Sequence, residues 1–220
     1  KGALKLLAQK TGIPFPNLSD QENEQLLKQA ELERKEQELL EVVLEIIKQR
    51  KLETSPSYLE TRGISKEIGR KYEAISCNLI IDSIRSILVE KGFSDEIINS
   101  SNVLYDSRLF ENSLIIPIKM GGKIITFCSR TLNDREPKYL YLKDHPKGIF
   151  NFDEAKTQQE IIITESPLDV LALIDHEILG AVSTGGCEIS EEQVSKFKRL
   201  RNKQIYICFD IDSLCAYAAD

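Results

Sequence analysis

The sequence predicts an α/β fold whose C-terminal part is a parallel sheet with flanking helices. From Gln159 onward, apolar runs alternate with helix-periodic segments, giving strands at 161–164, 181–183 and 204–210 and helices at 166–176 and 190–200. This alternation is typical of a parallel sheet, because each crossover helix returns the chain to the same edge. Further upstream, two β-rich runs joined by Gly121 and Gly122 predict a hairpin, and 138–142 is another candidate strand.

The N-terminal region is predicted to be helical. Residues 1–16 are typical of a helix end, with Gly12 followed by two prolines. A long polar helix then runs to about Lys51, and either Ser19 or Asp20 can cap it. Its second half carries an apolar stripe at helical spacing, formed by Leu39, Leu40, Val43, Ile46 and Ile47. Packing of this stripe on the chain's own domain is favoured over a coiled coil with a partner, and the charged first half is expected to face solvent.

Residues 54–101 are predicted to form a small helical unit. Short amphipathic segments lie at 57–63, 65–73, 82–91 and 94–101. Gly63 and Gly92 end two of them, and Ser65 and Ser94 begin two others, as is typical of helix caps.

The composition is that of an ordinary globular protein. Of 220 residues, 41% are hydrophobic and 29% are charged, and no apolar stretch approaches the roughly 20 residues of a membrane span. The start at Lys1 shows no signal-peptide pattern and is expected to lie inside a longer chain. The net charge of −6 does not exclude a nucleic-acid partner, because phosphate binding depends on local clusters of Lys and Arg.

The cysteines give no metal or disulfide pattern. Five are scattered without a C-x-x-C pair, and two histidines offer no zinc-site spacing: Cys77, Cys128, Cys187, Cys208, Cys215, His145 and His176. We expect buried, reduced thiols in a reducing compartment.

Three carboxylates follow predicted strands. Asp210 and Asp212 end the last strand and, two residues apart, would share a face of it, while Glu165 ends a neighbouring strand. Open parallel sheets build their sites at the carboxyl ends of their strands. Since Mg²⁺ is usually held by a few carboxylates together with substrate phosphates, the pattern favours metal-dependent phosphoryl chemistry. Ordinary loop carboxylates at strand ends are the alternative.

A set of sequence motifs occurs in one order along the chain: YLETRG, SLIIPI, GKIITFCSRTL, PKYLYL, HPKGIF, ITESPLDVLAL and CFDID. This order resembles the RNA polymerase domain of bacterial-type DNA primases, whose core is the toprim fold. Glu165, with Asp169, Ala172 and Leu173, is similar to the family's E-G-x-x-D-x-x-A-L motif, and Asp210-Ile211-Asp212 to its D-G-D motif. The resemblance spans nearly the whole chain and implies a partial toprim sheet.

The resemblance implies an enzyme that synthesises short RNA primers on single-stranded DNA during replication, with Mg²⁺ or Mn²⁺ as cofactor. The metal ligands would be Glu165, Asp210 and Asp212, with Asp169 either an additional ligand or a helix-capping residue; Glu165 could instead act as general base. The residues that would contact template and nucleotide phosphates are Arg62, Arg130, Lys138 and Lys147.

The resemblance also implies an organisation. Residues 1–53 would hold the end of a zinc-domain region and the linker helix, 54–150 a helical and mixed α/β subdomain, and 151–220 a truncated toprim domain. The zinc ligands and the domain that binds the replicative helicase would lie outside this chain. A monomer in the cytoplasm, at the nucleoid, is expected, with a plastid as the alternative compartment.

The chain departs from the family pattern at its site. Ser166 replaces a glycine, Ile211 replaces the middle glycine of D-G-D, and Leu214-Cys215 replaces Ala-Gly. Two other readings stay open: a toprim nuclease or topoisomerase that uses the same acids to cut rather than join, and a degenerate DNA-binding or replisome-docking remnant, which Ile211 favours. Gly185-Gly186 either approaches a phosphate or forms a tight turn, and is left unassigned.

Overall fold

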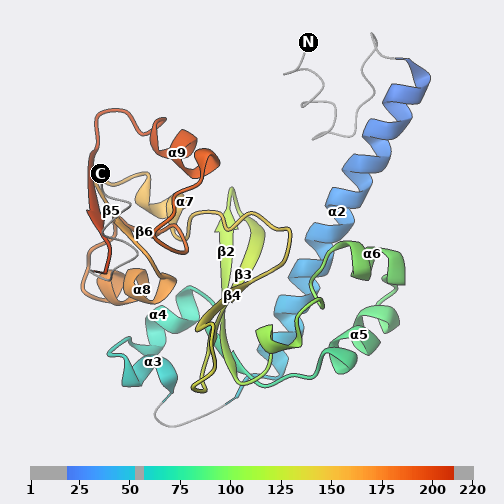
Figure 1. The fold of residues 1–220 in the computed structure, drawn as a ribbon, viewed down its shortest axis with the longest axis horizontal. Helices are drawn as coiled ribbons and strands as arrows, with labels where there is room; N and C mark the ends of the chain where they lie inside the picture. Colours follow the sequence, from blue (N-terminus) through green and yellow to red (C-terminus); the bar gives the residue numbers. More distant parts are fainter. Residues whose placement is uncertain (1–18, 53–56, 211–220) are drawn as a thin grey trace.

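The computed structural model describes residues 19–52 and 57–210, and Figure 1 shows the arrangement of their elements. The helices are α2 (Asp20–Gln49), α3 (Tyr58–Thr61), α4 (Lys66–Lys71), α5 (Ile81–Glu90), α6 (Asp95–Ser100), α7 (Phe152–Ala155), α8 (Pro167–Asp175) and α9 (Glu191–Phe197), with a 3₁₀ turn η1 (Ser107–Leu109). The strands are β1 (Ile75–Cys77), β2 (Ser113–Met120), β3 (Lys123–Thr131), β4 (Tyr139–Tyr141), β5 (Glu160–Thr164), β6 (Ala181–Ser183) and β7 (Gln204–Cys208).

The described strands form two sheets. The first is antiparallel in the order β1-β2-β3-β4, and the second is parallel in the order β6-β5-β7. The predicted hairpin at Gly121-Gly122 and the predicted parallel α/β sheet are therefore confirmed. The prediction that 54–101 forms a small helical unit is confirmed for α3, α4, α5 and α6 but misses β1, which pairs with β2. Three residues are too few to show strand alternation in sequence.

Helix α2 packs on the first sheet along its second half and projects beyond it along its first half (Figure 1). The apolar stripe is fully buried against α5, α6 and the sheet, which confirms that it packs on its own domain. Ser19 caps the helix through a capping box with Glu22. None of the described helices is long and apolar enough to cross a lipid bilayer.

The first sheet has a core on each face. Ile115 and Phe127 pack toward α2, whereas Leu114 and Ile116 pack toward α3, α4 and α8, as the two-residue period of a strand requires. Helix α8 therefore lies between the two sheets, since it also contacts β5 and β6. A third core lies on the other face of the parallel sheet, around Ile161, Ile163 and Phe197.

The cysteine prediction is only partly right. Cys77 and Cys128 are buried, and burial raises the pKa of each thiol to about 12. Cys187 is half-buried. Cys208 is exposed at the end of β7, which is one of the two edge strands of the described parallel sheet. Cys215 lies outside the described residues.

A hydrogen-bonded junction joins α8 to the N-cap of α4. The backbone amide and the hydroxyl of Ser65 each donate to the Asp175 carboxylate, at 2.7 Å, across 110 residues of sequence. These bonds hold the pKa of Asp175 below its ordinary value. The carboxylate therefore stabilises the fold above its unfolded-state pKa of about 4, and this contribution is lost as the pH falls through the lower folded pKa.

The Asp175→Asn variant is accordingly expected to melt a few degrees below the wild type at pH 7. The difference should shrink as the pH falls below about 4, because both side chains are then neutral. Thermal unfolding followed by circular dichroism from pH 2 to pH 8 measures it. A difference in melting temperature between the variant and the wild type that does not change with pH would show that the charge of Asp175 is not involved.

Candidate active site

Six of the residues predicted from sequence line one cavity of about 330 Å³, beside the carboxyl edge of the parallel sheet. The acidic members are Glu165, Asp169 and Asp210, and the basic members are Arg62, Arg130 and Lys138. Tyr139, Tyr141, Ser166, Gly185 and Gly186 complete its lining. The volume lies at the lower end of the range for small-molecule sites.

The parallel pairing of β5 with β7 brings Glu165 and Asp210 together. Thr164 is paired with Cys208, so the residues just beyond both strands emerge at the same edge. The backbone amide of Asp210 donates to Glu165 Oε1 at 2.7 Å. This hydrogen bond places a peptide dipole against the Glu165 carboxylate and offsets part of the repulsion between the two acids.

The predicted extent of the last strand is wrong by two residues. β7 ends at Cys208, because its partner β5 ends at Thr164 and the chain then turns into the cap of α8. Asp210 therefore lies two residues beyond β7, where the parallel pairing of β5 with β7 and the bond to Glu165 place it, and strand alternation does not. Asp212 and Ile211 lie outside the described residues.

Asp169 acts as a helix-capping residue in this structure. Ser166 is the N-cap of α8, and its hydroxyl and amide donate to Asp169 Oδ2 at 2.7 and 3.3 Å. The Asp169 amide donates back to Ser166 Oγ, which completes a capping box. The serine that stands where the family has glycine thus begins the helix that follows Glu165.

Two basic residues stack on the tyrosines of β4. Arg130 pairs with Tyr139 across β3 and β4, and its guanidinium lies 5.2 Å from the centre of that ring. Lys147 Nζ lies 5.3 Å from the centre of the Tyr141 ring. Burial raises the pKa of Tyr139 to about 12 and that of Tyr141 well above its ordinary value, so both rings stay neutral phenols near pH 7.

Lys147 does not line the cavity itself but supports one of its walls. Its Nζ donates to the carbonyl of Gly185 at 2.9 Å. Ser183 Oγ accepts from the Gly185 amide at 3.1 Å and donates to the Glu165 carbonyl at 2.7 Å. The glycine turn is thereby tied both to a basic residue and to the segment that carries Glu165.

The other basic residues approach from the first sheet and from α3. Arg62 follows α3 and is exposed, with its guanidinium 6.0 Å from the centre of the Tyr58 ring. Arg130 Nη1 donates to the carbonyl of Lys138 at 3.3 Å, which keeps these two residues adjacent. Within the described residues, the Lys138 ammonium has no hydrogen-bond or ion-pair partner.

Sequence reasoning did not single out Tyr139 and Tyr141 as site residues. The sequence could have indicated them, because Tyr139 and Tyr141 are two residues apart in a predicted strand and so share a face, and the predicted site residue Lys138 directly precedes them. Sequence alone does not distinguish a phosphate-binding turn from a tight turn at Gly185-Gly186; the structure places the pair on the cavity wall.

The donor set is suited to a hard divalent cation, because carboxylate oxygens are the ligands that Mg²⁺ and Mn²⁺ prefer. Glu165 and Asp210 supply such oxygens at one edge of the cavity. Among residues 19–52 and 57–210, no group of three or more His, Cys, Asp or Glu side chains is close enough to form a metal site. Asp212, the third predicted ligand, is not among them.

Comparisons with known proteins agree with this architecture. The family model of the DNA primase catalytic core, N-terminal domain, matches residues 42–155, and a Toprim-like model matches residues 162–217. A DNA primase of Borreliella burgdorferi is 28% identical over 233 residues, which cover 96% of this chain and 44% of that protein. The chain spans less than half the length of the first curated relatives that it matches.

Solved primase structures share the fold. The zinc-binding and RNA polymerase domains of Aquifex aeolicus primase match with a TM-score of 0.72 and 22% identity, covering 98% of this chain and 59% of that one. A primase catalytic domain bound to single-stranded DNA matches with a TM-score of 0.69 and 22% identity, covering 86% and 65%. Because the primase model matches more than half of the chain, the chain belongs to the bacterial-type DNA primase family, as the N-terminal domain of the catalytic core followed by a Toprim-like domain.

Proposed function

We propose that this chain is the catalytic core of a primase, which joins nucleotides into short RNA primers on single-stranded DNA. The observation that carries the proposal is the convergence of Glu165 and Asp210 with Arg62, Arg130 and Lys138 around one cavity, in a chain of the primase family. The primase catalytic domain solved with single-stranded DNA supports this choice of template.

The proposed reaction is nucleotidyl transfer. The 3′-hydroxyl of one nucleotide attacks the α-phosphorus of an incoming nucleoside triphosphate, and pyrophosphate leaves. A divalent cation held by Glu165, Asp210 and Asp212 would neutralise phosphate charge and favour ionisation of the attacking hydroxyl. Asp169 is the weaker candidate ligand, since its carboxylate is engaged in the capping box.

The basic residues would hold the phosphates in place. Arg130 presents a planar fork that suits two phosphate oxygens, and Lys138 supplies a point charge beside it. The Tyr139 ring behind Arg130 restricts the motion of the guanidinium without neutralising it. Arg62 would extend the positive surface toward the template, and Lys147 would act by fixing the glycine turn.

We further propose the organisation that the resemblance implies: the end of a zinc-domain region and the linker helix over 1–53, a subdomain over 54–150 and a truncated Toprim domain over 151–220. The matched ranges 42–155 and 162–217 support two units, with the division between residues 155 and 162, slightly later than the proposed one, and with the first range beginning within α2. The remaining parts of the full-length protein would bind zinc and the replicative helicase, beside replicating DNA in the cytoplasm.

The test is incorporation of labelled nucleoside triphosphates by the full-length protein on circular single-stranded DNA, with Mg²⁺ or Mn²⁺. The proposal predicts short, metal-dependent RNA products. Nicked or relaxed DNA without RNA products would indicate a toprim nuclease or topoisomerase. DNA binding with neither product would indicate a docking remnant, and either of these outcomes would reject the primase assignment.

A further inference from the structure

The loop between β3 and β4 carries Lys138 to the cavity and is closed at its base. The Thr131 amide donates to the Lys138 carbonyl at 3.0 Å, beside the bond from Arg130 to the same carbonyl. Lys138 itself is exposed, so its own side-chain packing does not hold it in place. Its position therefore depends on how residues 132–137 are held.

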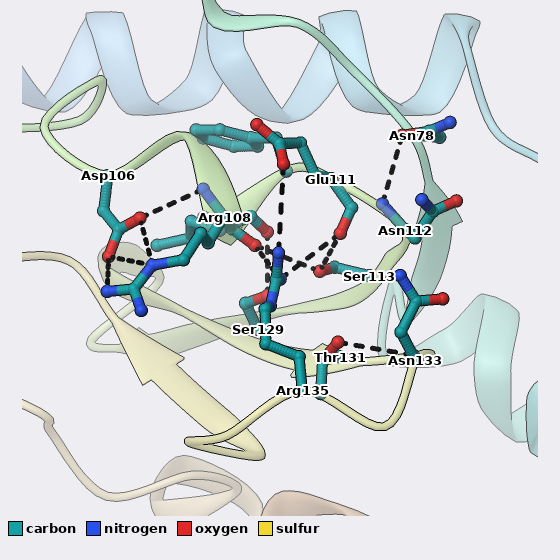
Figure 2. Close-up of polar contacts among 12 residues, drawn as sticks. Asn78, Asp106, Arg108, Glu111, Asn112, Ser113, Ser129, Thr131, Asn133 and Arg135 are labelled. Carbon is teal, nitrogen blue, oxygen red and sulfur yellow. Dashed lines mark hydrogen bonds and ion pairs between the residues drawn. The ribbon is translucent and has the colours of Figure 1, made fainter.

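Arg135, at the middle of this loop, does not line the cavity but turns toward residues 106–113 (Figure 2). Its Nη2 donates to the carbonyls of Arg108 and Glu111, at 2.7 and 3.4 Å, and Nη1 lies 3.8 Å from the Glu111 carboxylate. The side chain is 25% exposed. The nearby Leu132 amide donates to the Asn112 carbonyl at 2.8 Å and makes a second tether.

The surface that receives Arg135 is itself fixed. Asp106 accepts from the Arg108 amide and from its guanidinium at 2.6 to 3.1 Å, which closes the η1 turn. Ser113 Oγ donates to the same two carbonyls that Arg135 contacts. Hydrogen bonds from Arg108, with a smaller contribution from the charge of Arg135, hold the pKa of Asp106 below its ordinary value.

Arginine suits this role better than lysine does. Its planar fork reaches two carbonyls and a carboxylate together, whereas an ammonium on a flexible stem would satisfy only part of this set. The Nε of Arg135 is buried without a hydrogen-bond partner among the described residues. Such burial is unfavourable, so the contacts of the two terminal nitrogens must offset it.

We propose that Arg135 is a positioning residue: by anchoring the 132–138 loop to residues 106–113, it fixes Lys138 at the cavity for the nucleotide or template phosphates. The role of Lys138 rests on the proposed function, whereas the anchoring of the loop does not. Released from this anchor, the loop would sample more conformations, and the Lys138 charge would spend less time beside Arg130.

The kinetic test uses the full-length protein and a double-mutant cycle. Arg135→Gln is expected to raise the apparent KM for nucleoside triphosphates about 5- to 10-fold with a smaller change in kcat, and Arg135→Lys about 2- to 3-fold. In a Lys138→Ala background, Arg135→Gln should add less than about 2-fold, because both changes remove the same contact. Arg34→Gln on the solvent face of α2 is the matched control and should leave KM unchanged.

Hydrogen exchange gives a readout that does not need activity. Arg135→Gln should speed exchange at the amides of residues 131–133 and leave α8 unaffected. Unchanged exchange there would overturn the anchoring. The link to Lys138 would be overturned if the fold-changes in KM of Arg135→Gln and Lys138→Ala multiplied in the double variant. It would also be overturned if Arg135→Gln lowered the melting temperature and left KM unchanged. A wild-type protein that makes no primers would reject the proposed function, while the exchange data would still decide the anchor.

Discussion

Replacing Glu165 by glutamine is expected to lower primer synthesis by at least about 100-fold without disturbing the fold. Glutamine keeps an oxygen that can accept the Asp210 amide at the observed 2.7 Å, so the local geometry can persist. It removes the negative charge that would attract a divalent cation. The measurement is labelled-nucleotide incorporation at saturating Mg²⁺, with thermal unfolding as the check on folding.

Asp169→Asn is the matched control for Glu165→Gln. The amide oxygen of asparagine can still accept from Ser166, so the capping box survives and activity should stay within about 5-fold of the wild type. A loss as deep as that of Glu165→Gln would assign Asp169 a role beyond capping. Wild-type activity in Glu165→Gln would remove this carboxylate from the proposed metal site.

The Gly185→Ala substitution is expected to lower primer synthesis by about 10-fold or more, because the wall of the cavity would have to move. Gly185 has a φ of +76°, and an added Cβ would lie 2.6 Å from the Tyr141 hydroxyl oxygen and 3.3 Å from Lys147 Cδ. The turn would therefore shift away from Tyr141 and Lys147 and carry the adjoining segment with it. Incorporation assays on the full-length variant measure the loss.

Gly122→Ala is the control that separates the effect of the contact with Tyr141 from the effect of backbone strain. Gly122 has a similar φ of +75°, but nothing lies within 4 Å of an added Cβ, and it does not line the cavity. It should cost about 1 kcal/mol of stability and leave the activity of the folded protein unchanged. Combining Gly185→Ala with Tyr141→Phe removes the atom in closest contact and should restore part of the activity, measured against Tyr141→Phe alone. Equal losses in both alanine variants would show that strain alone, and not the contact with Tyr141, is responsible.

The parts of the fold that sequence predicts well are those set by local chemistry. The capping residues Ser19, Ser65 and Ser94 begin their helices as expected, because a side-chain cap involves only residues three apart. The alternation of apolar runs and helical segments is also visible in local sequence, and it predicts the parallel sheet because crossover helices connect parallel strands. Local sequence does not predict the end of β7, because that end depends on where its partner β5 stops, about forty residues earlier.

The site was predictable where a family motif supplies long-range information. Glu165 and Arg130 lie 35 positions apart in sequence, and the resemblance to primases, not their spacing, placed them around one cavity. Arg135 carries no such motif, and its partners Arg108 and Glu111 are 27 and 24 residues away. In sequence, Arg135 is one charged residue of a polar loop, and only the structure shows that its side chain contacts the carbonyls of Arg108 and Glu111.

The most direct test of the central claim is a Mn²⁺ titration of the protein followed by paramagnetic broadening of its amide resonances. At substoichiometric metal, the amides of Glu165, Asp210 and Gly185 should broaden first, while those of the solvent-exposed first half of α2 stay sharp. Glu165→Gln should abolish this selective broadening. Broadening that is uniform, or centred away from Glu165 and Asp210, would contradict the assignment of this cavity as the site of nucleotidyl transfer.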